Sequence, residues 1–416
     1  MTPEFKQRIE QIRNGEVPEG YKRTRAGIMP CDWCTQKEYK AKDIFYSVSN
    51  KNHNGDYEVL SATQDRGVIP RSQVYIDIKY DDANTSGYKM VDKGDFVISL
   101  RSFQGGIEYS EYTGLVSPAY TVLKPRVSIC DEYYKSYFKT NDFISRLNKG
   151  TYGIRDGKQV GFKDFGEMII HFPPLPEQQR IAKIISTQDK VIECYEKKIE
   201  QLKRVKKYYL QNMFPKRGET VPKIRFKGFT ESWEQRKLGQ ISTFINGRAY
   251  SQSELLPNGK YKVLRVGNFY TNDSWYYSDL ELGEKYYANF GDLLYTWSTT
   301  FGPHLWLGDK VIYHYHIWKV DLSDQLEKHF AIQLLEQDKN NIMSGKNGST
   351  MVHITKEGME QKEVIIPPDI SEQAKIGAFF GRIDNLITLH QRKLEEEKKK
   401  KKALQQLLLT GIVRTN

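Results

Sequence analysis

A chain of 416 residues is too long for one ordinary hydrophobic core and predicts two domains. Its composition, 38% hydrophobic and 12% aromatic, is that of a globular protein, and no apolar run approaches the roughly 20 residues that span a bilayer. The net charge of +11 predicts attraction to a polyanion. Nucleic acid is the favoured class, and an acidic membrane, an acidic protein or a merely solvated basic surface are the alternatives.

The cysteines and the first residues bear on the cellular compartment. Cys31, Cys34, Cys130 and Cys194 do not resemble a disulfide framework. The opening segment MTPEFKQRIEQIRNGE contains no apolar stretch of the kind found in secretory signals. We therefore expect a cytoplasmic protein.

Shifts in composition divide the chain into two similar halves that follow an N-terminal helical segment, residues 1–19. Residues 20–170 and 215–366 contain aromatic and β-branched runs interrupted by Gly, Asn and Asp, which predicts mostly-β domains with some helix. Residues 171–214 and 367–416 each predict one long helix, and the basic linker FPKRGETVPKIRFKG marks the start of the second half. The predicted fold class is α+β.

Three glycine-containing polar loops stand out in the first mostly-β domain. Arg suits guanine and Gln or Asn suits adenine in the major groove of DNA, whereas Lys, Ser and Tyr can hold phosphates. Glycine in the same loops allows close approach of the backbone. Ordinary surface loops explain such sequences about equally well. The candidate DNA contacts are Thr63, Gln64, Arg66, Arg101, Ser102, Gln104, Tyr109, Lys149, Tyr152, Arg155 and Lys158.

Two short motifs in the same domain suggest metal sites only weakly. Cys31 and Cys34 have the spacing of half a zinc site, but no second ligand pair follows, and thiols beside a core Trp33 are the better interpretation. Asp156-Gly157-Lys158 could end a nuclease metal site, but no acidic strand precedes it, and magnesium needs at least two placed carboxylates. We expect no metal ligand in the chain.

The phrase PPLPEQQRIAKII at 173–185 returns as PDISEQAKIGAFF at 368–380. The constant shift, 368 minus 173 or 195 positions, pairs Glu177 and Gln178 with Glu372 and Gln373, and it also pairs Asp189 with Asp384. Because the match extends over nearly forty residues without a gap, it indicates an internal duplication. The prolines that open each copy are tolerated at the start of a helix.

Each copy continues as an uninterrupted helix with apolar residues at heptad a and d positions, which predicts a coiled-coil seam. We expect the seam to be partly solvated midway, where Lys206 and Lys401 occupy matching a positions and Glu397 a d position. Two independent amphipathic helices are the alternative. About 37 residues at 1.5 Å each make a rod about 55 Å long, which can hold two domains apart. The seam residues are Ile181, Ile185, Ile192, Tyr195, Ile199 and Leu202 in the first copy, and Ile376, Phe380, Ile383, Ile387, Leu394 and Leu404 in the second.

The second mostly-β domain shares a framework with the first, but its loops differ. Gly94-Asp95 before FVISL corresponds to Gly291-Asp292 before LLYTW. His314 and His316 lie at strand period on one face, where they could serve a metal, DNA or a half-buried strand surface. We expect two dissimilar DNA-contacting faces. The candidates in the second are Arg248, Arg265, Asn268, Tyr295, Trp297, Ser298, Thr299, Lys346, Asn347, Ser349 and Thr350.

No sequence element predicts catalysis. Gly345-Lys346 lacks the upstream glycine and the following hydroxyl of a phosphate-binding loop. The Pro-Pro dipeptides lack the polar and aromatic neighbours with which an amino-methyltransferase grips a flipped base, and no glycine-rich turn offers a cofactor pocket. We therefore assign no catalytic residue.

The twice-repeated Pro-to-Glu-Gln phrase before a long helix, together with SLRSFQGGIEYSEYTGLVSPAYTVLKP at 99–125, resembles the specificity subunits of type I restriction-modification enzymes. The resemblance covers essentially the full length. It implies a non-catalytic DNA reader with two target-recognition domains, each addressing one half of an asymmetric, split target across a spacer. No fixed motif carries base contacts in this family, so the loop candidates rest on side-chain chemistry.

The resemblance also implies the partners. The two helices would pack antiparallel with pseudo-twofold symmetry, set the spacer and dock two methyltransferase subunits, and residues 1–19 would help to close the ring. The methyltransferase subunits would methylate adenine with S-adenosylmethionine, and restriction subunits would use ATP and Mg, with no cofactor in this chain. Two other classes remain as alternatives: a self-contained nuclease or methylase, and a coiled-coil scaffold that ignores DNA.

Overall fold

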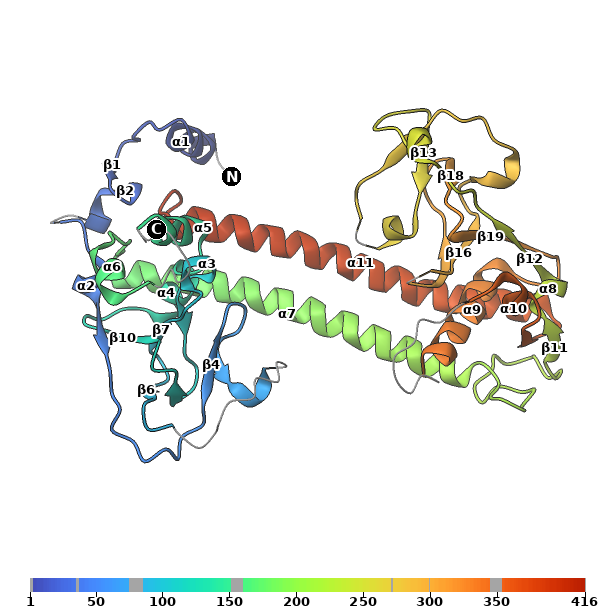
Figure 1. Cartoon of the computed structure of the whole chain (residues 1–416), viewed down its shortest axis with the longest axis horizontal. Coiled ribbons are helices and arrows are strands. Elements are labelled where there is room, and N and C mark those ends of the chain that lie inside the picture. Colours follow the sequence, from blue (N-terminus) through green and yellow to red (C-terminus); the bar gives the residue numbers. More distant parts are fainter. Residues whose placement is uncertain are drawn as a thin grey trace. The chain divides into compact units, whose positions relative to one another are not determined.

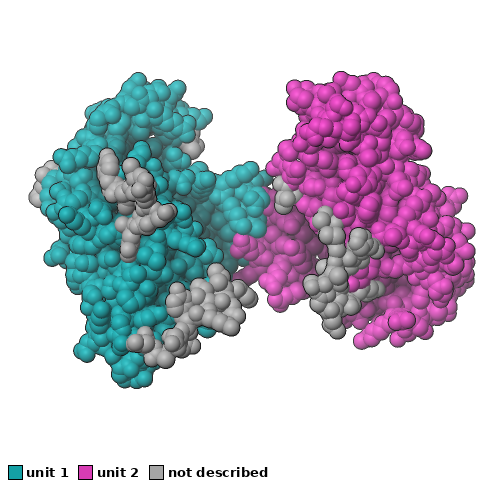
Figure 2. All heavy atoms as spheres, in the orientation of Figure 1, with its two compact units in different colours: residues 1–194, 394–416 teal, residues 195–393 magenta. Residues whose placement is uncertain are grey.

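The computed structural model describes residues 3–34, 37–74, 85–150, 160–270, 272–298, 300–344 and 354–415. Tertiary contacts divide the chain into two units, shown in different colours in Figure 2. Unit 1 comprises residues 1–194 and 394–416, and unit 2 comprises residues 195–393. Both long helices pass from one unit to the other, so each unit contains part of each helix. Within the described ranges, no helix combines the length and apolarity that crossing a membrane requires.

Unit 1 is built on a four-stranded antiparallel sheet in the order β3-β10-β7-β8 (Figure 1). A cluster of aromatic rings, with Phe45, Phe96 and Phe138 fully buried, joins this sheet to the helices. Three two-stranded pairs, β1-β2, β4-β5 and β6-β9, complete the unit. The elements are α1 (Pro3–Arg13), β1 (Tyr21–Thr24), β2 (Gly27–Pro30), α2 (Ala41–Ile44), β3 (Phe45–Val48), β4 (Leu60–Thr63), β5 (Gly67–Pro70), β6 (Lys89–Val91), β7 (Phe96–Ile98), α3 (Ser102–Gly105), β8 (Glu108–Tyr109), β9 (Gly114–Val116), β10 (Thr121–Pro125), α4 (Asp131–Tyr137), α5 (Asn141–Gly150), α6 (Phe162–Glu167) and the first part of α7 (Leu175–Asn212).

Unit 2 repeats this sheet as β12-β19-β16-β17 and adds a second four-stranded sheet, β14-β13-β18-β15. In the second sheet β13 and β18 are parallel, whereas the other pairs are antiparallel. The elements are β11 (Glu234–Lys237), α8 (Leu238–Ile241), β12 (Ser242–Asn246), β13 (Tyr261–Leu264), β14 (Tyr276–Ser278), β15 (Tyr287–Ala288), β16 (Leu293–Thr296), β17 (Gly302–Leu305), β18 (Val311–Tyr313), β19 (Ile317–Leu322), α9 (Lys328–Ser344), α10 (Lys356–Glu360), β20 (Glu363–Ile366) and the first part of α11 (Ile370–Leu409).

The duplication includes the registers of the two sheets. Ile98 lies opposite Thr121 in unit 1, and Tyr295 lies opposite Trp318 in unit 2. Both residues of the second pair are 197 positions beyond those of the first. The same offset relates the pairing of β3 with β10 to that of β12 with β19. The sheets are therefore copies of one framework.

The turn before the third strand of each sheet is built in the same way. Gly94 and Gly291 have φ angles of 101° and 88°, which favour glycine because it has no Cβ. The following Asp95 carboxylate accepts a 2.8 Å hydrogen bond from the Asp92 amide, and Asp292 accepts one of 2.8 Å from Asn289. The Gly-Asp echo in the sequence is thus a shared turn.

Helices α7 and α11 run side by side and antiparallel within each unit (Figure 1). In unit 1, Gln188 donates a 3.3 Å hydrogen bond to the carbonyl of Glu397, and Asp189 pairs with Lys401. The predicted seam residues are all buried or half-buried: Ile181, Ile185, Ile192, Tyr195, Ile199 and Leu202 on α7, and Ile376, Phe380, Ile383, Ile387, Leu394 and Leu404 on α11. The α+β class with a coiled-coil helix pair agrees with the expectation from the sequence.

The lysines predicted at a partly solvated part of the seam are indeed partly exposed, and each also forms an ion pair across the helix pair. In unit 2 the ammonium of Lys206 lies 2.7 Å from Oδ1 of Asp384. The Lys401–Asp189 pair of unit 1 is its counterpart, because both members are shifted by 195 positions. The two seam lysines are therefore neutralised across the helix pair by the duplicated aspartates.

The repeated Glu-Gln phrase ties each long helix to its unit. Gln178 accepts a hydrogen bond from the amide of Cys130, the residue before α4, and donates one to the carbonyl of Pro173. Gln373 accepts from the amide of Glu327, the residue before α9, and donates to Pro367. Both glutamines are fully buried. They satisfy backbone groups that would otherwise be left unpaired at a helix start.

The glutamates of the same phrase are buried, and each forms an ion pair with an arginine. Glu372 accepts hydrogen bonds of 2.7 and 2.8 Å from Nε and Nη2 of Arg225. Glu177 accepts two bonds, of 2.7 and 2.8 Å, from Arg414, and a third from the indole of Trp33 at 2.9 Å. In each unit the arginine comes from the segment that follows a long helix. We call each pair the Glu–Arg lock of its unit.

Candidate nucleic-acid interface

In unit 1 the structure brings the first two predicted loops together. Thr63 closes the turn between β4 and β5, because its hydroxyl donates to the carbonyl of Gly67 at 2.9 Å. The side chain of Gln64 packs over Gly105, where an added Cβ would lie only 2.7 Å from Gln64 Cγ. The loops at 63–66 and 101–105 therefore form one continuous surface.

An ion pair between half-buried Lys139 and buried Glu108 holds these two loops in place. The ammonium of Lys139 lies 2.5 Å from Glu108 Oε1, 2.8 Å from the carbonyl of Gly105 and 3.3 Å from that of Gln64. Glu108 is 1% exposed, and burial raises the pKa of its carboxyl to about 7 against the opposing effect of Lys139. One lysine thus connects both loops to β8.

The predicted residues of unit 1 differ in their exposure. Gln64, Arg66, Arg101, Gln104 and Lys149 are exposed, and Lys149 lies in the last turn of α5, which packs against α3. Their side chains are available to a partner.

Two other predicted residues of unit 1 are less accessible. Tyr109 is half-buried against Phe96, and burial raises its pKa to about 12. Ser102 is 1% exposed, and its hydroxyl accepts a 2.8 Å bond from the amide of Ser99. The expectation of DNA contact is therefore corrected for Ser102, whose hydroxyl closes a turn inside the protein.

In unit 2 three of the predicted loops converge on the turn that connects β18 to β19. The amide of Arg248 donates to the carbonyl of Tyr313, and the amide of Tyr315 donates back to Arg248 at 3.0 Å. His314 donates to the carbonyl of Leu264, the residue before Arg265, and Trp297 donates to that of His316. The residues 313–316, which we call the His-Tyr turn, thus join the loops at 247–250, 265–268 and 297–298.

The two predicted arginines flank this turn, each engaged within its own loop. Arg248 lies 2.6 Å from Glu254, and its guanidinium is 5.1 Å from the ring centre of Tyr250. Arg265 lies 4.3 Å over the ring of Tyr276 and donates to the carbonyl of Ser274. Both side chains are half-buried, and Nη1 of Arg248 and Nε of Arg265 are buried without a hydrogen-bond partner in the described part of the chain.

The other candidate residues of unit 2 that the structure describes are partly or fully engaged in contacts within the protein. Asn268 accepts from the amide of Arg265 and donates to the carbonyls of Asn272 and Ser274, so its amide group is used within its own loop. Tyr295 is 0% exposed and stacks on Trp318, which corrects the expectation that it contacts DNA. Trp297 and Ser298 are half-buried. Tyr152, Arg155, Lys158, Thr299, Lys346, Asn347, Ser349 and Thr350 lie outside the described residues.

Comparison with known proteins identifies this architecture. The family model described as "Type I restriction modification DNA specificity domain" matches residues 36–204 and again residues 230–398. The chain belongs to this family of type I restriction-modification specificity subunits. Specificity subunits are the non-catalytic DNA-recognition components of their complexes, and the duplicated match coincides with the two copies found in the sequence.

Curated relatives in the specificity-subunit family come from Methanocaldococcus jannaschii. The MjaVIII specificity subunit is 26% identical over 78% of this chain and 80% of its own length, and the putative MjaX specificity subunit is 26% identical over 95% and 97%.

Among solved structures, a chain from a study of assembly and conformational transition in a type I system has a TM-score of 0.55 at 14% identity, covering 96% of this chain and all of its own. The specificity subunit from M. genitalium has a TM-score of 0.51 at 14% identity, covering 91% and 96%. At these identities the structures establish a common fold.

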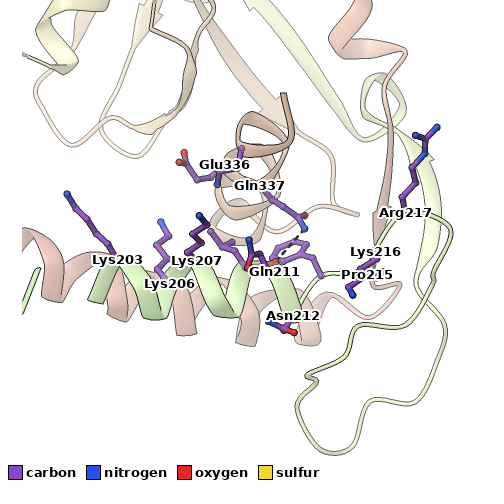
Figure 3. A pocket seen from close by; sticks show the side chains of 13 residues that line it. Lys203, Lys206, Lys207, Gln211, Asn212, Pro215, Lys216, Arg217, Glu336 and Gln337 are labelled. Atoms are coloured by element: carbon purple, nitrogen blue, oxygen red, sulfur yellow. Dashed lines mark hydrogen bonds between the residues drawn. The ribbon is translucent and has the colours of Figure 1, made fainter. Parts of the chain in front are cut away.

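Unit 2 of this specificity subunit also carries a basic groove of about 1150 Å³ where α7 ends (Figure 3). Lys203, Lys206 and Lys207 project from the same side of α7, and Lys216 and Arg217 follow on the next segment (Figure 3). Of these five cations, only Lys206 forms an ion pair in the described part of the chain. The groove is a concentration of positive charge that a polyanion can neutralise.

Sequence reasoning missed the His-Tyr turn as the organising element of the unit 2 surface. His314 and His316 at strand period predict a strand rather than a turn, because aromatic and β-branched neighbours favour strands. The backbone bonds that gather three loops around the turn involve segments far apart in sequence.

The described residues contain no group of three or more His, Cys, Asp and Glu side chains that could hold a metal ion. Cys31 and Cys34 therefore do not belong to such a group.

Proposed function

We propose that this chain selects a bipartite, asymmetric DNA target, with one half-site read by each recognition domain. The observation that carries the proposal is one sheet framework, repeated at an offset of 197 positions, that supports two chemically different surfaces. In unit 1 the exposed side chains are Gln64, Arg101 and Gln104, whereas unit 2 offers Trp297, Tyr315 and the flanking arginines. Two unlike surfaces on one framework suit a target whose halves differ.

The proposal extends to the partners. The chain would dock two methyltransferase subunits that methylate adenine with S-adenosylmethionine, and restriction subunits that use ATP and Mg would join for cleavage. The net charge of +11 and the basic groove support association with the phosphate backbone of double-stranded DNA. The long helices would act as the spacer, because they connect the recognition domains through continuous backbone hydrogen bonding.

A change in helix length tests the spacer. Seven residues inserted into both helices, after Cys194 and after Lys393, would add about two turns or about 10 Å while keeping the heptad phase. We expect the gap between the half-sites to increase by about 3 base pairs, at 3.4 Å per base pair, while each half-site stays the same. Long-read mapping of methylated adenines in cells that express the variant with its partner subunits measures both quantities.

The same insertion in one helix only is the matched control. It puts the seam residues of the two helices out of register, so we expect methylation to be lost. A new half-site sequence at an unchanged gap would contradict the spacer, and methylation by this chain without partner subunits would contradict its role as a specificity subunit.

A further inference from the structure

The two central strands of the recognition sheet in unit 2, β16 and β19, carry a stack of aromatic rings. Tyr295 and Trp318 stack at 6.0 Å with an interplanar angle of 17°, and Trp297 continues the stack on Trp318 at 5.6 Å and 21°. The first two rings are buried, whereas Trp297 is half-buried and forms the outer end. The stack therefore extends rigidly from the core to the surface.

The His-Tyr turn is attached to the outer end of this stack. The indole of Trp297 donates a 2.9 Å hydrogen bond to the carbonyl of Tyr315, and His316 meets the Trp297 ring edge-on at 5.0 Å. The rings of Tyr315 and His316 lie 3.9 Å apart, and Tyr315 is 39% exposed. Four backbone bonds from three segments of the chain hold the same turn, so the backbone that carries these rings is fixed.

Charge and protonation suit this surface to nucleic acid. Burial, with smaller contributions from His316 and Arg265, lowers the pKa of His314 to about 4, and burial lowers the pKa of His316. Both imidazoles are therefore neutral near pH 7, and each offers one donor and one acceptor. Tyr315 is exposed and the two imidazoles are half-buried. Aromatic rings between two guanidinium groups can provide base contacts next to phosphate contacts.

The framework itself does not require these rings. At the offset of 197 positions, Tyr295 and Trp318 correspond to Ile98 and Thr121 in unit 1, and Trp297 corresponds to Leu100. Residues 314–316 correspond to Ser117, Pro118 and Ala119. The same sheet forms in unit 1 without the stack, so the rings are particular to the face of unit 2.

We propose that Trp297 and residues 314–316 form an aromatic reading head that contacts the bases of the half-site addressed by unit 2. Tyr315 and His316 would lie against thymine methyl groups, and Arg248 and Arg265 would contact the adjacent phosphates. The inference rests on the proposed function, and it assigns a reading chemistry to one half-site. Unit 1, which lacks the stack, reads through polar side chains.

Variants of Tyr315 and His316 test the reading head in the complex with the partner methyltransferase subunits. Tyr315→Ala and His316→Ala should each weaken binding to the mapped target about ten- to a hundredfold and leave binding to unrelated duplex unchanged. Tyr315→Phe, which keeps the ring, should bind like the unmodified protein. Phe290→Ala is the matched control, because Phe290 is 73% exposed in the same unit but lies at the other end of β16.

Replacement of thymine by deoxyuracil at each position of the unit 2 half-site completes the test. In the unmodified complex at least one replacement should weaken binding, and Tyr315→Ala should abolish that sensitivity, whereas replacements in the other half-site should act equally on both proteins. Tyr315→Ala and His316→Ala complexes that bind and methylate like Phe290→Ala would overturn the reading head alone. An unmodified complex without sequence preference would overturn the proposed function as well.

Discussion

The two units hold the same helix-start glutamate in different surroundings. In unit 2, Glu372 is 0% exposed, and in the described part of the chain Arg225 is the sole side chain that donates to it. In unit 1, Glu177 is 2% exposed and receives the Trp33 indole as well as Arg414, whose guanidinium also reaches Asp32. Duplication has thus preserved a buried carboxylate while each copy acquired its own set of donors.

The largest expected effect comes from removing one arginine of the Glu–Arg locks. Arg225→Met should destabilise unit 2 by about 3–5 kcal/mol, because it leaves a buried carboxylate without its counter-charge. Arg414→Met should destabilise unit 1 by only about 1–3 kcal/mol, because Glu177 keeps the hydrogen bond from Trp33. Hydrogen exchange of the full chain, read separately for the two units, measures both free energies of unfolding.

A surface arginine provides the control for this pair of variants. Arg236 pairs with Glu234 on the surface of unit 2, and Arg236→Met should change stability by less than about 0.5 kcal/mol. Equal losses for Arg225→Met and Arg414→Met would show that Trp33 does not support Glu177.

Lowering the pH should change the stability of the two units by different amounts, and this effect should be of intermediate size. In unit 2, burial lowers the pKa values of His304 and His314 to about 4. Between pH 6.5 and 4 the unfolded chain binds more protons than the folded unit, so stability falls as pH falls. In unit 1, burial lowers the pKa of His171 to about 4 but raises that of Glu108 to about 7, and protonation of Glu108 favours the folded state as pH falls from 7.

We therefore expect unit 2 to lose more stability than unit 1 between pH 7 and pH 5. The difference should be at most about 2 kcal/mol, because His314 is partly exposed and solvent weakens its effect. Hydrogen exchange at the two pH values, corrected for intrinsic rates, gives the change in each unit. In Glu108→Gln, unit 1 should become about as sensitive to acid as unit 2, and an unchanged response in this variant would contradict the assignment.

How much the sequence predicts depends on whether a feature follows the duplication. The offset of 195 positions predicts two long helices, their proline starts and the repeated Glu-Gln phrase, because these are local patterns that both copies retain. It does not reveal the Glu–Arg locks, because Arg225 and Arg414 are 189 positions apart and thus fall out of register in the superposition. Both arginines lie in irregular segments, where no periodicity indicates which carboxylate a side chain will reach.

The candidate DNA-contacting faces are harder still to predict. Composition singled out Ser102 and Tyr295, but the side chains point into the protein, because one closes a turn and the other extends an aromatic stack. The exposure of such residues depends on the packing of loops that are distant in sequence. By contrast, the sequence contained enough to predict the neutralised seam, since the superposition had already aligned Asp189 with Asp384 and Lys206 with Lys401.

The smallest expected effect comes from these seam ion pairs. Lys206 and Lys401 are 18% and 28% exposed, and partly exposed ion pairs contribute about 0–1 kcal/mol. Lys206→Leu removes the pair with Asp384 but adds apolar contact to the seam, and Asp384 keeps a 3.2 Å hydrogen bond from Gln333. We therefore expect each of Lys206→Leu and Lys401→Leu to change the stability of its unit by less than about 1 kcal/mol, as measured by denaturant unfolding.

Lys399→Leu, at an exposed position of α11, is the matched control. A loss above about 2 kcal/mol in either seam variant, with none in the control, would mean that the ion pairs fix the register of the helices, a role that buried polar pairs have in some coiled coils.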